Sequence, residues 1–563
     1  MDSDEVKATV SESEHSEKSK HILNVDLNDC EDPDRIHTFM GLSGLKLNYA
    51  VSVFAGVGFL LFGYDQGVYG SLLSLDSFEN TFPSMKASVN STLQGAVIAV
   101  YELGCGFAAL STVYLGDKLG RIKCMFLGCV IVVIGAALQA SAFTVTHLAI
   151  ARVFTGFGTG YLTATVPVWS SEMSKAKSRG KLIMMEGSLI TLGITISYWV
   201  DFGFYFVDKG GDPKAISWRI PVVLQAIFPI FLIMFVFKFP ESPRWLMAKG
   251  RVREARIVFS ALYNVPEGDE KITDQLTEIQ SAIELEKSSD EGFSLKALTS
   301  QGPTRNFHRL SLACWSQIMQ QISGINLITY YAGTIFQNYI HMSPFNARIL
   351  AACNGTEYFL ASLFGILFIE RVGRRKLLFW GAIGQSLSMV ALTVAAWKSQ
   401  VAHDAQGGNS TPPGIAATVF LFVFNSVFGV SYLGATWLYP PEISALQLRA
   451  PTAALSTASN WAFNFLIVMI TPVCFENIQY YTYTIFAVIN ALMAPAIYFF
   501  YPETSGRTLE EMDFIFNQCP VKEPWKVVQI EKNTPRRRHA ENDLEKPTVE
   551  HIDNVDSDGI LSK

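Results

Sequence analysis

Charged residues are scarce in this chain of 563 residues: they make up 17% of it, whereas 49% is hydrophobic. A soluble enzyme of this length would carry more charge, so that class is excluded. Polar residues concentrate at the two ends, 1–45 and 515–563, which are rich in Ser, Glu, Asp and Lys. Such segments bury too little apolar surface to offset the entropy of ordering the chain, so we predict disordered cytosolic arms.

Several signatures of chemistry are missing as well. The eight cysteines lack the spacing of a disulfide framework or a metal site, and most fall inside apolar stretches, where we interpret them as packing residues. The sequence has no phosphate-binding glycine loop, no cluster of metal-ligating residues and no nucleophile elbow. We therefore expect neither an enzyme nor a bound cofactor or metal.

An extended basic run and a cleavable signal are also lacking. The short basic cluster Arg536–Arg538 is interpreted as a solvated tail segment or a contact with anionic lipid, so nucleic acid is not an expected partner. The first apolar stretch begins near residue 48 and is too long for the core of a signal peptide. Insertion is expected to use the first spanning helix itself.

Apolar stretches of about 20 residues recur between the polar ends, and each is long enough to cross the bilayer as a helix. We place twelve spans near 48–71, 92–115, 124–143, 147–171, 180–205, 218–238, 309–337, 347–369, 376–397, 414–438, 452–474 and 481–501. The sequence therefore predicts an all-α membrane protein with twelve transmembrane helices.

Basic residues in the loops indicate the orientation, because Lys and Arg are retained on the cytosolic side. Such residues follow the second, fourth and eighth predicted spans, so both termini of this multi-pass protein are expected in the cytosol. The sequons Asn90-Ser-Thr and Asn409-Ser-Thr then fall in outer loops, where they can be glycosylated. Asn354-Gly-Thr lies inside a predicted span and is expected to stay unmodified.

A polar stretch between the sixth and seventh spans divides the chain. Its segments Val252–Tyr263 and Ile272–Leu285 have helical patterning and many charges. We predict a disordered cytosolic N-terminal tail (1–46), an N-terminal six-helix half (47–240), a cytosolic helical linker (241–308), a C-terminal six-helix half (309–502) and a cytosolic C-terminal tail (503–563).

Three local signatures occur twice at a nearly constant separation, as expected of a duplicated six-helix unit. They are GDKLGR at 116–121 with IERVGR at 369–374, Glu172 and Arg179 with Glu442 and Arg449, and PESPR at 240–244 with PETSGR at 502–507.

These motifs, with QQISGIN at 320–326 and PETSGRTLEE at 502–511, resemble the sugar porter family of the major facilitator superfamily over about residues 47–512. The combination is specific, whereas any one motif alone is weak. The segments YELG, EGS and YPPEI are similar to the fungal branch that contains the yeast glycerol–proton symporter. The resemblance implies the major facilitator fold and transport by alternating access.

The duplicated charges lie at predicted cytosolic helix ends. Paired acids and arginines there can bridge neighbouring helices when the cytosolic side is closed and separate when it opens. We predict a gating network, and ordinary cytosolic anchoring is the alternative. Its members are Asp117, Arg121, Glu172, Arg179, Glu241, Arg244, Glu370, Arg374, Glu442, Arg449, Glu503 and Arg507.

Two ionisable residues lie within predicted spans at similar depths. Asp65 in span one and Arg152 in span four are each about 8–10 Å from the outer helix ends at 1.5 Å per residue, so they can meet. Because an arginine favours the ionised form of a nearby carboxylate, separating the pair favours proton binding. We predict proton coupling, a role that the family resemblance also implies, and a static ion pair is the alternative.

Three further acids, Glu102, Glu186 and Glu357, lie in spans two, five and eight without a basic partner at helical spacing. Each is interpreted as a protonated or hydrogen-bonded packing residue or, alternatively, as an acceptor for the hydroxyl groups of a solute.

Span seven carries the pattern of a solute site. Gln317, Gln320, Gln321 and Gly324 recur on one helix face, with Asn326 and two tyrosines, Tyr330 and Tyr331, beyond them. Amides offer the paired donors and acceptors that a polyhydroxylated solute requires, and Gly324 permits local unwinding. A single amide in a span is usually a contact between helices, but three on one stripe favour a binding site.

The family resemblance extends this site to other helices. It implies that Gln320, Gln321 and Asn326 contact the sugar, together with Trp437, Asn460, Trp461 and Asn464 in spans ten and eleven. Gly187 stands where hexose carriers typically have a glutamine, Tyr358 stands at the usual asparagine, and Thr436 replaces the usual proline before Trp437. These departures weaken a glucose assignment and keep a polyol or smaller sugar open.

The leading hypothesis is a secondary active transporter that imports a monosaccharide, a hexose or pentose, by proton symport at the fungal cell membrane. The alternatives are a glycerol or polyol symporter, a facilitative sugar uniporter and a non-transporting sugar sensor. The expected partners are a small sugar or polyol, protons and the lipid bilayer. A monomer is expected to function, because one chain contains both halves.

Overall fold

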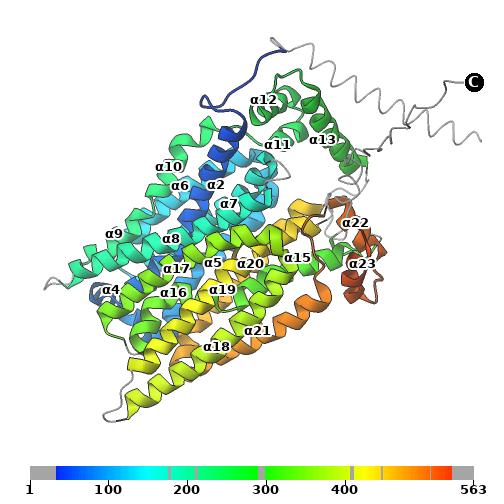
Figure 1. The fold of residues 1–563 in the computed structure, drawn as a ribbon. Coiled ribbons are helices and arrows are strands. Elements are labelled where there is room, and N and C mark those ends of the chain that lie inside the picture. Colours follow the sequence, from blue (N-terminus) through cyan, green and yellow to red (C-terminus); the bar gives the residue numbers. More distant parts are fainter. Residues whose placement is uncertain are drawn as a thin grey trace, which may run out of the picture.

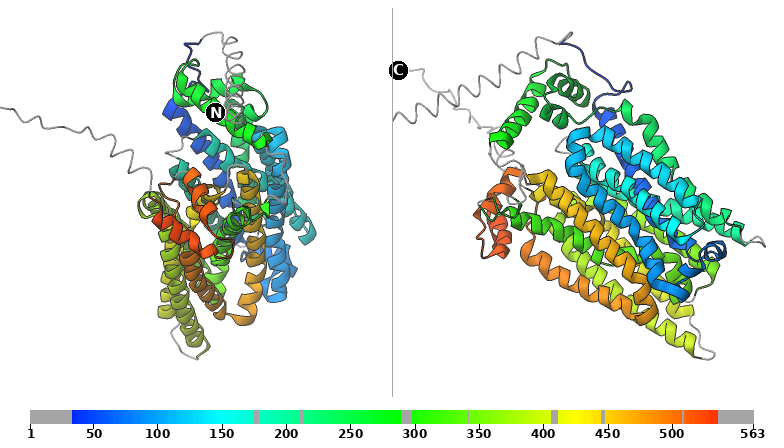
Figure 2. Two further views of the ribbon diagram at one scale, coloured as in Figure 1. Left: turned by 90° about the vertical axis from the view of Figure 1, so that its right-hand side faces the viewer. Right: turned by 180° about the vertical axis from the view of Figure 1, so that it is seen from behind.

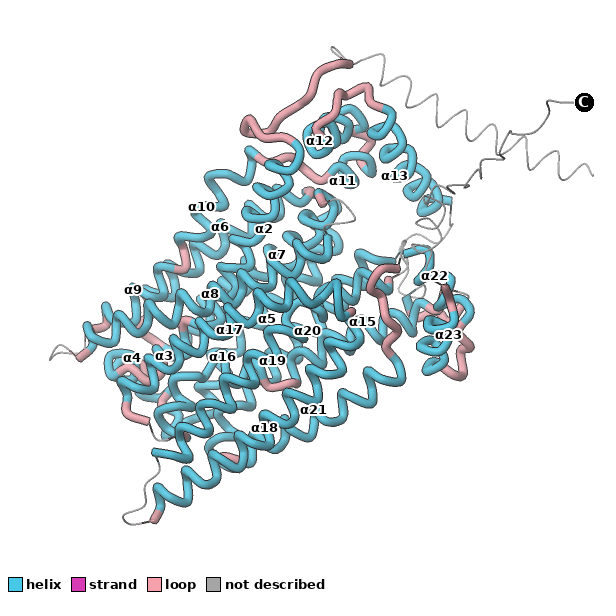
Figure 3. The backbone as a smooth tube through the Cα atoms, viewed as in Figure 1, coloured by secondary structure: helices cyan, strands magenta, loops and turns pink. Residues whose placement is uncertain are grey.

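The computed structural model describes residues 33–174, 179–209, 214–288, 298–302, 304–340, 342–405, 411–444, 448–507 and 509–535. In this part of the chain the backbone forms helices joined by loops, with one isolated β-bridge between Phe39 and Leu42 (Figure 3). Helices satisfy their backbone polar groups internally, as a membrane interior requires. The predicted all-α fold is confirmed.

The N-terminal half consists of helices that correspond to spans one to six. They are α2 (Gly44–Gly67), which α3 (Tyr69–Leu72) continues, α5 (Ala87–Leu119), α6 (Arg121–Ala140), α7 (Val145–Met173), α8 (Arg179–Asp208), and α9 (Ile216–Leu224) with α10 (Ile227–Phe235) and the turn η2 (Val236–Lys238). The short elements α4 (Asp76–Thr81) and η1 (Pro83–Met85) connect the first two spans.

The C-terminal half repeats this order. Its elements are α15 (Asn306–Ile322), α16 (Ile325–Thr334), η3 (Ile335–Tyr339), α17 (Pro344–Val372), α18 (Arg374–Asp404), α19 (Thr411–Ile443), α20 (Arg449–Ile478) and α21 (Tyr481–Phe500). Between the halves lie α11 (Pro243–Ala248), α12 (Val252–Tyr263) and α13 (Glu270–Ser288), and α22 (Leu509–Gln518), η5 (Pro524–Lys526) and α23 (Val527–Asn533) follow the last span.

Within the described residues, ten helices are long and apolar enough to cross a membrane. The two further spans are α7 and the α15–α16 pair. The Gly and Thr residues of α7 lower its hydropathy, and span seven is broken at Gly324 into two shorter helices. With these two, the chain has the twelve spans that the sequence predicts.

The two halves pack side by side along their long helices. Helix α5 lies against α20, and α8 lies against α17 (Figure 2). Helices α11, α12 and α13 lie at the same end of the bundle as α22 and α23 (Figure 1). We call this the linker end.

The outer faces of the bundle are apolar. Large hydrophobic side chains are exposed along α18 and α21, among them Trp380, Leu387, Leu492 and Phe499. Exposed apolar surface of this extent requires a hydrocarbon environment. The protein is therefore a multi-pass membrane protein.

The prediction of disorder is wrong for parts of both tails. In the N-terminal segment, Glu267 and Gly268 donate backbone hydrogen bonds to Arg35 and Pro33, at 3.2 and 3.0 Å. In the C-terminal segment, η5 and α23 are helical, and Val527 and Val528 are buried. Composition averaged over a tail misses such short apolar segments, because they become ordered only by packing on the rest of the protein.

Candidate functional site

Seven amide side chains from four helices form a hydrogen-bonded network where the two halves meet. They are Gln66 on α2, Gln317, Gln320 and Gln321 on α15, Asn326 on α16, and Asn460 and Asn464 on α20. All seven are buried. The structure therefore brings together every amide that the sequence and the family resemblance singled out, and adds Gln66.

Asn326 lies at the centre of this amide network. Its Oδ1 accepts a hydrogen bond from Gln66 Nε2 at 2.8 Å, and its Nδ2 donates to Asn464 Oδ1 at 2.7 Å and to Gln321 Oε1. Gln66 belongs to the N-terminal half and the other three belong to the C-terminal half. A solute that bound to Asn326 would therefore contact both halves.

The network extends from Gln321 toward the linker end through Gln320 and Asn460. Asn460 Nδ2 donates to Gln320 Oε1 at 2.9 Å and to Gln317 Oε1 at 2.6 Å. Gln320 Nε2 donates to the carbonyl of Leu433 at 3.2 Å. The amides thus bind one another, and among their fully buried atoms only Asn464 Nδ2 has no hydrogen-bond partner in the described part of the chain. Hydroxyl groups of a solute can replace these partners because each amide both donates and accepts.

Gly324 separates the amides of α15 from Asn326. Its φ is +100°, a left-handed conformation in which a side chain would be strained. A Cβ there would also lie 3.0 Å from the ring of Phe486. The glycine therefore allows the backbone to turn between α15 and α16 while all these amides face the interface.

Two tryptophans of the C-terminal half pack edge-on against phenylalanines of α2. The ring centroids are 6.5 Å apart for Trp437 and Phe59, and 5.2 Å apart for Trp461 and Phe62. The aromatic side chains thus border the amides from both halves, and an indole face is a surface on which C–H groups of a sugar pack well.

Two of the three positions at which the sequence departs from hexose carriers are filled by apolar contacts. A Cβ on Gly187 would lie 3.7 Å from Leu433 of the other half. Tyr358 is buried, and its ring packs edge-on against Phe428 with centroids 6.2 Å apart. Neither position supplies the amide that a hexose carrier typically has there.

Asp65 and Arg152 are both buried in the N-terminal half, and in the described structure each hydrogen-bonds to other groups. Tyr101 lies between them. Its hydroxyl donates to Asp65 Oδ2 at 3.3 Å, and Arg152 lies over its ring at 4.8 Å. Thr159 also donates to Asp65, at 3.3 Å.

The guanidinium of Arg152 is held by backbone and rings. It donates to the carbonyl of Ile98 at 2.7 Å and lies 4.5 Å above the ring of Tyr69. The sequence placed Asp65 and Arg152 at one depth, but only the tertiary structure shows that Tyr101 contacts both of them.

The three other acids within spans have different surroundings. Glu102 accepts a hydrogen bond from the hydroxyl of Tyr330, which we expected to contact the solute, and Glu357 accepts one from Ser426. Glu186 is buried beside Ser170 of α7.

At the linker end, the duplicated charges form two similar networks, one in each half. In the N-terminal half, Glu241 accepts hydrogen bonds from the backbone N–H groups of Arg121 and Ile122 at 3.0 and 3.1 Å, at the start of α6. The Arg121 guanidinium binds both carboxylate oxygens of Glu172 on α7, at 3.1 and 3.0 Å. Burial raises the pKa of Glu241 above its ordinary value, and backbone N–H groups oppose this shift.

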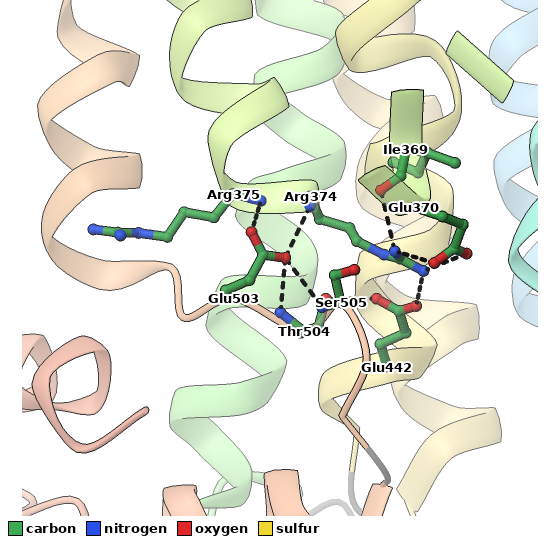
Figure 4. Close-up of polar contacts among 8 residues, drawn as sticks. All are labelled: Ile369, Glu370, Arg374, Arg375, Glu442, Glu503, Thr504 and Ser505. Carbon is green, nitrogen blue, oxygen red and sulfur yellow. Dashed lines mark hydrogen bonds and ion pairs between the residues drawn. The ribbon is translucent and has the colours of Figure 1, made fainter. Parts of the chain in front are cut away.

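The C-terminal half repeats this geometry (Figure 4). Glu503 accepts from the backbone N–H groups of Arg374 and Arg375, at 2.9 and 3.1 Å, at the start of α18. The Arg374 guanidinium binds Glu370 at 2.9 Å and Glu442 on α19 at 2.9 Å. A carboxylate at a helix N-terminus satisfies free N–H groups and is favoured by the helix dipole.

A glycine makes each of these carboxylate sites possible. Gly120 and Gly373 precede the two helices with φ of +86° and +93°. A Cβ on them would lie 2.6 Å from Glu241 Oε2 and 2.4 Å from Glu503 Oε2. The Gly-Arg pair of both motifs therefore admits the carboxylate and places the arginine beside it.

Other members of the predicted gating network lie elsewhere or are not described. Arg507 binds Glu531 of α23 at 2.8 Å, and so links the last span to the tail. Arg244 lies in the first turn of α11. The side chains of Asp117, Arg179 and Arg449 lie outside the described residues.

The structure describes one of the two predicted glycosylation sites. Asn90 is exposed near the start of α5, at the end of the bundle opposite the linker, and its Oδ1 accepts a hydrogen bond from the Leu93 N–H at 2.9 Å. Asn409 lies outside the described residues.

The family model described as sugar (and other) transporter matches residues 51–516 of this chain. The chain belongs to this family. The sugar transporter STL1 of Saccharomyces cerevisiae is 38% identical over 498 residues, which cover 86% of this chain and 84% of the relative. The MFS-type transporter oryC of Aspergillus oryzae is 35% identical over 530 residues, which cover 92% and 96%.

A solved structure has the same fold. The proton:xylose symporter XylE, bound to 6-bromo-6-deoxy-D-glucose, superposes with a TM-score of 0.71 at 24% identity, over 83% of this chain and 99% of that one. The predictions of a sugar porter fold and of a transporter rather than an enzyme are therefore confirmed.

Three residues of the candidate site escaped the sequence reasoning. Tyr101 and Thr159 contact Asp65, and Gln66 contacts Asn326. A search for ionisable groups passes over neutral hydroxyls and a single amide. Gln66 did have one signal, because it directly follows Asp65 in the sequence.

Proposed function

We propose that this sugar transporter family member imports a small polyhydroxylated solute, a monosaccharide of the hexose or pentose type, together with a proton by alternating access. The observation that carries the proposal is the amide network, which spans both halves through the hydrogen bond between Gln66 and Asn326. A site shared by two halves can face either side as the halves rock.

The solute is proposed to bind among Gln320, Gln321, Asn326, Asn460 and Asn464. Buried amides remain stable only when paired, so a solute that replaces their mutual hydrogen bonds must present several hydroxyl groups. Trp437 and Tyr330 border the site and complete the proposed set of contacts. A relative named a sugar transporter and the shared fold with a proton:xylose symporter support this class of solute.

The proton is proposed to bind at Asp65, under the influence of Arg152. In the described state Tyr101 hydrogen-bonds to Asp65 and its ring lies beneath Arg152, so a small movement of these helices can bring the two charges together or separate them. Contact with the arginine favours the ionised carboxylate, and separation favours the protonated one.

A glycerol or polyol symporter is the second candidate. It is favoured by Gly187 and Tyr358, which leave out two amides that a hexose carrier typically has. A smaller solute needs fewer polar contacts, and the seven amides present are already close enough to bind one another.

We further propose that the linker end faces the cytosol and that the transporter lies in the cell membrane with both termini inside. The basic residues of the loops support this orientation. The opposite end, which includes α3 and α4, is then the outer end. The linker-end networks are proposed to hold helices together within each half as the halves move.

Uptake of labelled glucose, xylose and glycerol into cells that lack their own carriers tests the proposal. Accumulation of one solute above its external concentration, abolished by a protonophore, is expected. Equilibration without accumulation would instead indicate a facilitative uniporter. If the protein is folded at the cell surface and no solute enters, the transport proposal is refuted and the sensor alternative is favoured.

A further inference from the structure

Helix α16 is joined to the N-terminal half by two side chains on one of its faces. Asn326 and Tyr330 are four residues apart and therefore neighbours on the helix surface. Asn326 accepts a hydrogen bond from Gln66, and the Tyr330 hydroxyl donates to Glu102. Both partners belong to the other half, so these two bonds must break if α16 separates from the N-terminal half.

Glu102 has no part in the transport steps proposed above, yet its position is unusual. Its exposed fraction is 0%, and its Oε2 has no hydrogen-bond partner among the described residues. The preceding residue, Tyr101, donates to Asp65. One turn of α5 therefore contacts both Asp65 and α16.

Helix α16 also packs closely on α3 at the outer end. A Cβ on Gly333 would lie 2.9 Å from the carbonyl oxygen of Gly70 and 3.1 Å from Ser71 Oγ. Ser71 has an exposed fraction of 2%. We therefore expect a reagent from outside to reach Ser71 when α16 moves away from α3.

We propose that Glu102 is a positioning residue of the outer gate, which holds α16 against the N-terminal half by accepting the hydrogen bond of Tyr330. Through Tyr101, Glu102 also links this closure to the state of Asp65. The direction of movement rests on the proposed alternating access. A net hydrogen bond shifts a two-state equilibrium by roughly 2- to 10-fold.

The test uses Ser71→Cys as a reporter and the rate of its labelling by a membrane-impermeant maleimide added outside, without solute. The same backgrounds without the reporter give the contribution of the native cysteines. Glu102→Leu and Tyr330→Phe are each expected to raise the rate by about 2- to 10-fold, and together by no more than the larger single effect. Glu102→Gln retains an acceptor oxygen and is expected to keep the slow rate.

Glu357→Leu is the matched control. Glu357 also accepts a hydrogen bond from a neighbouring helix, but its partner Ser426 belongs to the same half. This variant is expected to leave the labelling rate unchanged. A rise as large as that of Glu102→Leu would refute the proposal, as would unchanged labelling in both Glu102→Leu and Tyr330→Phe.

Two further comparisons complete the test. Glu102→Leu is used only if it elutes as a folded protein on size-exclusion chromatography. If it does not, the labelling rates of Tyr330→Phe and Glu102→Gln are compared instead, and a faster rate in Tyr330→Phe supports the proposal. Asp65→Asn is expected to change the labelling rate when Glu102 is present but not in Glu102→Leu, and an equal change in both would refute the link to Asp65. Because labelling requires neither solute nor a proton gradient, its failure leaves the transport proposal intact, and the uptake assay tests that proposal separately.

Discussion

Replacement of Glu503 by alanine is expected to destabilise the start of α18. The carboxylate accepts from the N–H groups of Arg374 and Arg375 in that first turn, and also from those of Thr504 and Ser505. Loss of an N-terminal cap costs about 0.5–2 kcal/mol, and loss of a negative charge there about 0.3–1 kcal/mol. The expected total is about 1–3 kcal/mol.

The assay is the apparent melting temperature of the purified transporter in detergent without solute. For a unit the size of one half, each kcal/mol corresponds to a fall of about 2–4 °C. Glu503→Gln keeps one acceptor oxygen, so its loss should be smaller. Glu241→Ala tests the duplicated geometry and should lower the melting temperature by a similar amount, because Glu241 accepts the equivalent N–H groups of α6.

The control is Glu254→Ala on α12. Glu254 forms an exposed ion pair with Arg251, and such pairs contribute little. If Glu503→Ala lowers the melting temperature no more than Glu254→Ala does, the carboxylate does not stabilise the helix start and the reasoning is wrong.

Four other substitutions test the remaining sites. Asp65→Asn is expected to abolish accumulation against a gradient but to spare solute exchange in a counterflow assay, and retained accumulation would remove Asp65 from coupling. Asn326→Ala removes the central amide and should weaken the apparent solute affinity by about 10-fold. Asn425→Ala breaks a separate pair with Asn354 and should change this affinity far less. Equal effects of the two substitutions would contradict the proposed site. Arg348→Gln removes a buried donor to Ser74 of the other half, with contacts at 2.8 and 3.0 Å, so it should speed labelling of the Ser71→Cys reporter, and an unchanged rate would exclude Arg348 from the outer contact. Asn90→Gln should remove a glycosidase-sensitive shift on a gel if the outer orientation is right, and an unaltered pattern would show that Asn90 carries no glycan.

The candidate site was predictable to the extent that its residues form patterns along one helix. The three glutamines of α15 recur on one face, and this spacing indicates a polar stripe in an apolar span. Asn460 and Asn464 lie four residues apart in one span, yet we singled them out only through the family resemblance. Gln66 and Tyr101 could not be found in this way, because their importance depends on partners from other helices.

The predicted gating network shows the same division. The sequence places Glu241 and Glu503 in matching motifs, but it does not show that their carboxylates bind the N-termini of α6 and α18. It also grouped Arg507 with the other arginines, whereas folding of the tail brings Glu531 to it. Polar composition alone led us to expect no structure in that segment.

The sequence by itself determined the membrane protein class, the number of spans and the duplication. The bilayer thickness sets the length of each hydrophobic span, and a duplicated six-helix unit repeats its motifs, so both features can be read along the chain. Only the tertiary structure decided which polar groups bind one another. A buried amide, hydroxyl or carboxylate must find its partner in space, and the partners here lie on helices up to hundreds of residues apart, as Gln66 and Asn326 do.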